Sequence, residues 1–136
     1  MSPRNWIVVA SFSALISVAF GAFGAHALRA RLEPRALEVY QTAVHYQMFH
    51  SLALFGVGVL ALHAQSSSPL SAVGESNMLG LLNIAAWLFT GGILVFSGSL
   101  YALAITDIKI LGAVTPIGGL GFLAGWATLA WAAWKG

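Results

Sequence analysis

The chain has 136 residues, of which 59% are hydrophobic and only 7% are charged. Soluble domains contain about 25% charged residues, so this composition excludes a water-soluble globular protein and predicts a membrane protein. Six basic and four acidic residues are too few for a nucleic-acid-binding surface, and the absence of cysteine excludes disulfides, zinc–thiolate sites and thiol catalysis.

Four runs that lack charged residues predict four membrane-spanning helices, near residues 5–28, 35–64, 78–105 and 110–134. Each run is long enough to cross a hydrocarbon core of roughly 30 Å, which takes about 20 helical residues. Backbone polar groups cannot stay unpaired in lipid, and alternating strand patterns are absent, so the spans are helices. The predicted fold is an all-α integral membrane four-helix bundle that forms one domain over residues 1–136.

Of the connections between these runs, only residues 65–77 form a loop-like stretch of any length. Pro34 suits the first turn of the second helix, and residues 106–109 predict a tight turn, so the last two helices form a hairpin. A sequence echo, G-x-x-x-A-x-A-aliphatic, occurs at Gly21–Leu28 and at Gly98–Ile105. Two parallel hairpins related by an axis along the membrane normal would produce this echo, and the abundance of Gly and Ala in membrane helices explains it equally well.

The distribution of basic residues predicts the orientation. Four of them flank the connections between helices one and two and between helices three and four, against two near the termini. The positive-inside rule therefore predicts a multi-pass protein of the bacterial inner (plasma) membrane with both termini in the periplasm.

Most polar side chains in the predicted spans fall in the half of each helix that lies nearer the basic connections. We expect eight of them to form one polar layer, with His26, His50 and Tyr101 facing the interior of the bundle. The candidate binding residues are His26, Tyr46, Gln47, His50, Ser97, Ser99, Tyr101 and Thr115.

Three interpretations of this layer compete. Its side chains could form only structural hydrogen bonds between helices. They could line a pocket for a lipid headgroup or a small polar molecule, with Arg29, Arg31 and Arg35 at the headgroup level. They could also line a proton or ion path, since ionisable residues inside a membrane indicate function.

Catalytic and metal-binding patterns are missing from the sequence. His45 and His50 are five residues apart, which places them about 140° apart around a helix, so they cannot share a metal ion. The spans contain no Asp or Glu to act as a base, and Ser97 and Ser99 lack an activating partner. We therefore expect no metal site, no cofactor and no enzymatic activity.

Glycine and proline in the last span bear on packing. Gly121 and Gly125 form a smooth face that packs either inside the bundle or against a neighbouring protomer. We expect Pro116 to bend or loosen this helix at the polar layer.

Four ordered motifs resemble the small membrane family known as domain of unknown function 423, which includes the bacterial YgdD and YwdK proteins and vertebrate transmembrane protein 256. They are Gly21–Leu28, Tyr40–His50, Phe96–Tyr101 and Thr115–Gly119, and the resemblance covers nearly the whole chain. It implies a four-helix protein, in bacteria of the inner membrane, and implies no activity.

The combined expectation is a binding or accessory protein with a lipid-headgroup or small-molecule site in one leaflet. The alternative is a small oligomeric channel or transporter, for which the polar layer would have to continue through the opposite leaflet. The expected partners are membrane lipids and either further copies of the chain or a larger membrane complex.

Overall fold

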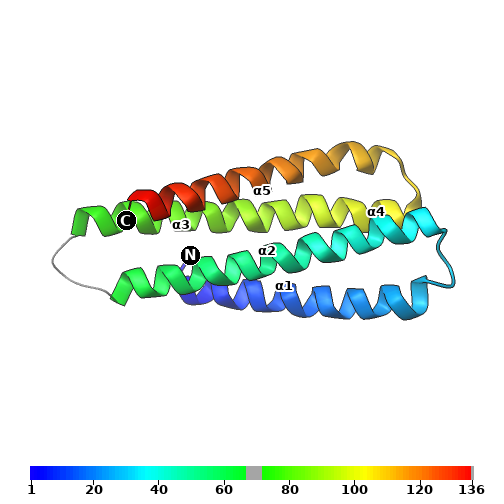
Figure 1. Ribbon diagram of the computed structural model, residues 1–136, viewed down its shortest axis with the longest axis horizontal. Coiled ribbons are helices and arrows are strands. Elements are labelled where there is room, and N and C mark those ends of the chain that lie inside the picture. Colours follow the sequence, from blue (N-terminus) through cyan, green and yellow to red (C-terminus); the bar gives the residue numbers. More distant parts are fainter. Residues whose placement is uncertain (67–71, 136) are drawn as a thin grey trace.

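A computed structural model describes residues 1–66 and 72–135, and of residues 72–76 it describes the backbone alone. The chain is all-helical over this part, and four long apolar helices pack as a bundle (Figure 1). Two of them include a π-helical turn, labelled η. The elements are α1 (Pro3–Phe23), η1 (Gly24–Leu28), α2 (Pro34–Ser66), α3 (Ala72–Gly92), η2 (Ile93–Ser97), α4 (Gly98–Thr106) and α5 (Ile110–Lys135).

The helix ends follow from local chemistry. The Ser2 hydroxyl caps α1 by accepting a hydrogen bond from the Asn5 amide at 3.4 Å, and Pro3 occupies the first turn. Asp107 ends α4 in the left-handed conformation, with φ of 54°. The four predicted spans are confirmed, although α3 begins at Ala72 rather than near residue 78. The predicted loop over 65–77 is therefore mostly helical, and residues 67–71 lie outside the described part.

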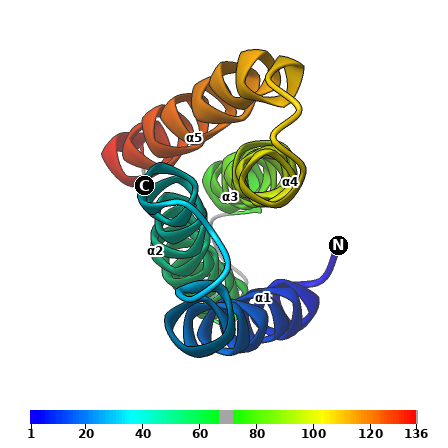
Figure 2. The same ribbon diagram turned by 90° about the vertical axis from the view of Figure 1, so that its right-hand side faces the viewer.

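The helices are arranged as two inner and two outer helices. α2 and the α3–η2–α4 helix lie inside and are more buried than α1 and α5, which lie on opposite sides (Figures 1 and 2). The hairpins α1–α2 and α3–α5 lie alongside each other. A two-fold axis along the membrane normal would have to superpose the outer helix α1 on the inner α3–η2–α4 helix, so the two hairpins are not related by such an axis. The sequence echo is also structurally unequal, because its first copy ends in η1 whereas its second copy is α-helical.

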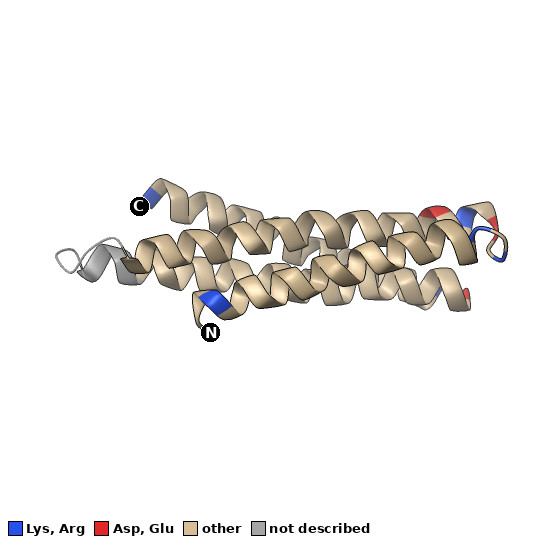
Figure 3. Cartoon of the chain, turned by 90° about the horizontal axis from the view of Figure 1, so that it is seen from below, with Lys and Arg blue, Asp and Glu red and all other residues tan. Residues whose placement is uncertain are grey.

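Among residues 1–66 and 77–135, the charged residues lie at the two ends of the bundle (Figure 3). Arg29, Arg31, Arg35 and Lys109 gather at one end, and Arg4 and Lys135 lie at the other. The long uncharged middle is the pattern of a membrane-spanning protein. We call the end with four basic residues the basic end.

Glycines set the close contacts between helices. A Cβ added to Gly118 of α5 would lie 2.8 Å from Phe96 Cα, so this crossing admits no side chain. Gly121 and Gly125 pack against Gly92 and Phe89 of α3, which places both inside the bundle rather than against a neighbouring protomer.

The expected irregularity near Pro116 is wrong. α5 stays α-helical through Pro116, and the Thr115 hydroxyl donates to the Leu111 carbonyl at 3.2 Å, within the turn that the proline interrupts. The irregular backbone lies instead in the π-helical turns η1 and η2, which the sequence analysis did not anticipate. Such turns occur frequently at functional sites.

Candidate functional site: two polar clusters and an interfacial groove

The first polar cluster joins α1, α2 and α4 around Gln47. Its Nε2 donates to the Ser13 carbonyl at 3.0 Å, and its Oε1 accepts from the Tyr101 hydroxyl at 2.8 Å. Ser51 Oγ lies 2.7 Å from Ser13 Oγ and 2.7 Å from the Gln47 carbonyl oxygen. We call these four residues the Gln47 cluster. Both ends of the buried amide are bonded, so it holds three helices together.

The side of α1 that faces α2 adds two bonds from side chains to the main chain. Ser17 donates to the Val44 carbonyl at 2.9 Å, and Tyr40 donates to the Phe20 carbonyl at 3.0 Å. The Tyr101 ring contacts both aromatic rings, with centroids 5.0 Å from Phe20 and 5.1 Å from Tyr40. These contacts fix the direction of the Tyr101 hydroxyl toward Gln47.

The second cluster joins α2 to α5 around His50. Its ring stacks on Phe122 with centroids 3.4 Å apart, and its Nε2 accepts from the Trp126 indole N–H at 3.3 Å. Nδ1 lies 2.8 Å from the Tyr46 carbonyl. Since Nε2 accepts, Nδ1 carries the proton and donates, which assigns one neutral tautomer. Tyr46 is partly exposed and stacks on Phe96 with centroids 4.5 Å apart.

Two hydroxyls join α4 to α5. Ser99 Oγ and Thr115 Oγ1 lie 2.8 Å apart, both buried. Ser97, in the π-helical turn η2, is 1% exposed, and its hydroxyl has no hydrogen-bond partner among the described residues. Seven of the eight candidate residues therefore lie at helix contacts, in separate groups.

The predicted single layer needs two corrections. His26 is exposed, because Gly24 and Leu28 face α2 and the residue between them points away from it. His50 and Tyr101 face different neighbours and are not directly bonded. Polar contacts also reach the other half of the bundle, where the Trp6 indole N–H donates to Asn83 Oδ1 at 2.8 Å.

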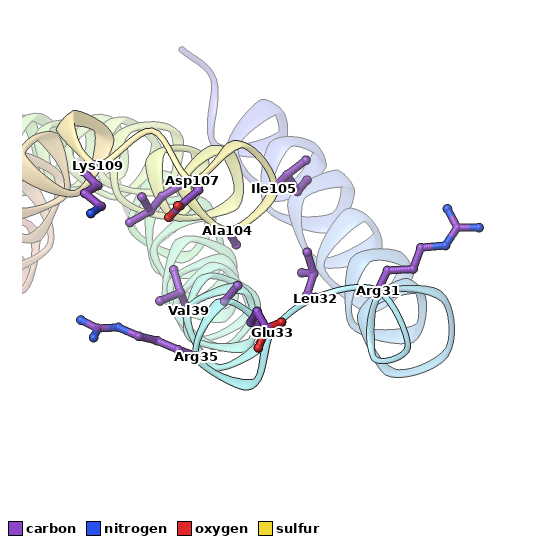
Figure 4. A pocket seen from close by; sticks show the side chains of 11 residues that line it. Arg31, Leu32, Glu33, Arg35, Val39, Ala104, Ile105, Asp107 and Lys109 are labelled. Atoms are coloured by element: carbon purple, nitrogen blue, oxygen red, sulfur yellow. The ribbon is translucent and has the colours of Figure 1, made fainter.

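A cavity lies at the basic end, between the α1–α2 connection and the α4–α5 turn, and we call it the interfacial groove (Figure 4). It is open to the outside and has a volume of about 810 Å³. Its charged lining comprises Arg31, Glu33, Arg35, Asp107 and Lys109, and its apolar lining comprises Leu32, Ala36, Val39, Leu103, Ala104 and Ile105.

The basic side chains of the groove do not all point the same way. Arg35 of α2 and Lys109 of the turn extend to the same side, whereas Arg31 extends to the opposite side (Figure 4). Arg29 does not line the groove, although the sequence grouped it with Arg31 and Arg35. No ion pair joins these charges to one another within the described residues. The cations are therefore available to a ligand.

Several residues of these sites were missed from the sequence. The sequence does contain a signal for three serines. Ser13 and Ser17 are four residues apart, and Ser51 lies four residues after Gln47, so each pair shares one face of its helix. Trp126 carried none, because a tryptophan within an apolar span looks the same in sequence whether it faces lipid or a polar partner. Among residues 1–66 and 77–135, no three His, Asp or Glu side chains are placed to hold a metal ion.

Comparison with known proteins supports the membrane assignment. A family model described as Protein of unknown function (DUF423) matches residues 20–119. The chain is 42% identical to the UPF0382 membrane protein YwdK of Bacillus subtilis over 97% of the chain and 98% of that protein. It is 39% identical to a UPF0382 membrane protein of Haemophilus influenzae over 97% of the chain and 95% of that protein. No solved structure matches the chain.

Proposed function

Since the chain belongs to the DUF423 (UPF0382) family of bacterial membrane proteins of unknown function, we propose that it is a binding protein whose interfacial groove holds the headgroup of a phospholipid. It is a multi-pass membrane protein, so phospholipid is the molecule most concentrated around the groove. The proposal includes no catalytic step.

The observation that carries the proposal is the composition of the groove. Its lining includes the apolar residues Leu32, Val39 and Leu103, and its charged residues lie at the end of the bundle. An amphipathic ligand at a membrane surface has the same division between acyl chains and headgroup. Arg35 and Lys109 extend to the same side from two different elements, so both attract an anionic group bound at this end of the groove.

The acidic residues of the groove point to the headgroup class. Glu33 and Asp107 also line it, so a purely anionic headgroup would meet two carboxylates. A headgroup with a primary amine beside its phosphate can pair with both the acidic and the basic side chains of the groove. Its ammonium donates to the carboxylates, and its phosphate accepts from Arg35 and Lys109. Phosphatidylethanolamine therefore fits the groove better than phosphatidylglycerol.

The polar clusters between the helices have a structural role in this account. The Gln47 amide, the His50 ring and the Ser99 hydroxyl are each bonded to groups of the protein. Bonds of this kind hold membrane helices in one arrangement and contribute about 0.6 kcal/mol each. A channel or transporter would instead need polar groups free to exchange partners along a path.

The test is lipid binding by purified protein in detergent, followed by native mass spectrometry. The double variant Arg35→Gln/Lys109→Gln is expected to lower phosphatidylethanolamine affinity roughly 25-fold, since each basic group near a membrane contributes about 1 kcal/mol. Arg29→Gln is the control for each of the two single changes, because it removes one positive charge from the same end outside the groove. An equal loss in the control, or no loss in the double variant, would refute the proposal.

A further inference from the structure

Two polar side chains of α2 point out of the protomer. Gln41 and His45 are exposed, and neither makes a hydrogen bond to another described residue. Their four-residue spacing puts them on the same face of the helix. A hollow of about 260 Å³ beside them, bordered by Gly21 and Gly24 of the neighbouring helix, adds no polar side chain from α1.

His45 lies inside the membrane, and Gln41 lies closer to its surface. Ser17 donates to the carbonyl of Val44, the residue before His45, so His45 is level with the middle of α1. Ser17 is roughly 18–20 Å along that helix from Arg4 and from Arg29 at 1.5 Å per residue. On α2 itself the nearest charge is the exposed Glu38, about 10 Å from His45 and one turn before Gln41, which places Gln41 near the headgroup level at the basic end.

An imidazole that faces hydrocarbon, as His45 does, is costly. A polar group without a hydrogen bond in lipid costs several kcal/mol. Ionisable residues in membrane spans therefore face the protein interior or a water-filled cavity in nearly all cases. Gln47, six residues along the same helix, shows the usual arrangement, being 6% exposed and bonded at both ends of its amide. The outward face at Gln41 and His45 lacks an equivalent partner.

We propose that a second copy of this chain covers this face and that Gln41 and His45 bond across the interface. Each side chain carries both a donor and an acceptor, so identical groups can pair with each other. A copy inserted in the same orientation presents them at the same depth, which a two-fold axis along the membrane normal requires. A buried polar residue at such a contact fixes the register of a helix pair.

The rest of the same face suits close helix contact. Phe49 is 67% exposed and Leu52 is 59% exposed, and both follow Gln41 and His45 at helical spacing. Gly56 continues the row, and a Cβ added there would meet nothing within 4 Å. One side of α2 lies uncovered between α1 and α5 in the end view (Figure 2), and Gln41, His45, Phe49 and Leu52 are all exposed. We call the row Gln41, His45, Phe49, Leu52 and Gly56 the α2 face.

Disulfide cross-linking tests the contact directly, because the chain contains no cysteine. Phe49→Cys, in protein reconstituted into vesicles of phosphatidylethanolamine and phosphatidylglycerol, is expected to form a covalent dimer on oxidation. Leu94→Cys is the matched control, since Leu94 is 70% exposed on the α3–α4 helix, away from the α2 face. No dimer with Phe49→Cys, or equal cross-linking at both positions, would overturn the proposal.

A second measurement separates the polar contact from chance proximity. The double variant Gln41→Leu/His45→Leu, measured by energy transfer between labelled copies in the same vesicles, is expected to weaken dimerisation roughly tenfold or more. Gly56→Leu should also weaken it, whereas Gly91→Leu should not, although both glycines face open space. Unchanged dimerisation in the double variant would overturn the proposal and would favour a lipid or another protein at this face.

Discussion

The Tyr101 hydroxyl donates to Gln47 Oε1 at 2.8 Å, and this bond joins α4 to α2 across 54 residues of sequence. The same amide donates to the Ser13 carbonyl of α1, so one side chain links three helices. Removal of the Gln47 amide should therefore lower the stability of the protein through two lost bonds, one to Tyr101 of α4 and one to Ser13 of α1.

We expect Tyr101→Phe to lower the free energy of unfolding by about 0.6 kcal/mol and Gln47→Leu by about 1–2 kcal/mol, because the second change breaks two interhelical bonds. The double variant should lose less than the sum, since the Tyr101 hydroxyl is no longer left unpaired. Unfolding of the purified protein in mixed micelles measures all three. Strictly additive losses would mean that the bond contributes nothing.

The bonding around His50 predicts one imidazole tautomer. The Trp126 indole donates to Nε2, so the proton should reside on Nδ1, facing the Tyr46 carbonyl. Nitrogen NMR of protein labelled at histidine should show the Nδ1–H form for His50, and Trp126→Phe should allow the other tautomer to appear. A wild-type spectrum dominated by the Nε2–H form would show that the Trp126 bond is absent.

Two glycines provide a packing test, because Gly118 lies at a helix contact and Gly91 faces open space. Gly118→Ala should lower the free energy of unfolding by about 1–3 kcal/mol, because its Cβ would contact the Phe96 backbone, which cannot rotate away. Gly91→Ala has open space and should be neutral or stabilising by up to about 1 kcal/mol. Equal thermal stability of the two variants would contradict the helix crossing described here.

The orientation can be tested with single cysteines. Four basic residues at one end against two at the other favour periplasmic termini. A membrane-impermeant maleimide should therefore label Ser2→Cys in intact spheroplasts and Ala30→Cys only after the membrane is opened. The reverse pattern would place the interfacial groove in the outer leaflet.

The spans were predictable from the sequence because a single charge in hydrocarbon is costly, so gaps between charged residues mark the helices. The π-helical turns η1 and η2 were not predictable. They replace α-helical turns of ordinary composition, Gly24–Leu28 and Ile93–Ser97, so no residue type marks them in the sequence.

The depth of the polar residues was easier to predict than their direction. A soluble helix shows its buried face as an apolar stripe, but a membrane helix is apolar on the lipid side as well. The expectation that His26, His50 and Tyr101 face inward holds for His50 and Tyr101 and fails for His26. Gln41 and His45, which were not among the candidates, are exposed as well. The groove at the basic end was only partly foreseen, because Lys109 and Asp107 reach it from a turn distant in sequence.

The headgroup preference of the groove is the most direct test of the proposed function. Asp107→Asn removes one carboxylate and keeps a residue that tolerates the left-handed conformation at this position. Native mass spectrometry should show that the wild-type protein retains phosphatidylethanolamine over phosphatidylglycerol and that the variant reduces this preference roughly fivefold or more. Equal retention of both lipids by the wild-type protein, or the same preference in the variant, would contradict binding of an amine headgroup in the interfacial groove.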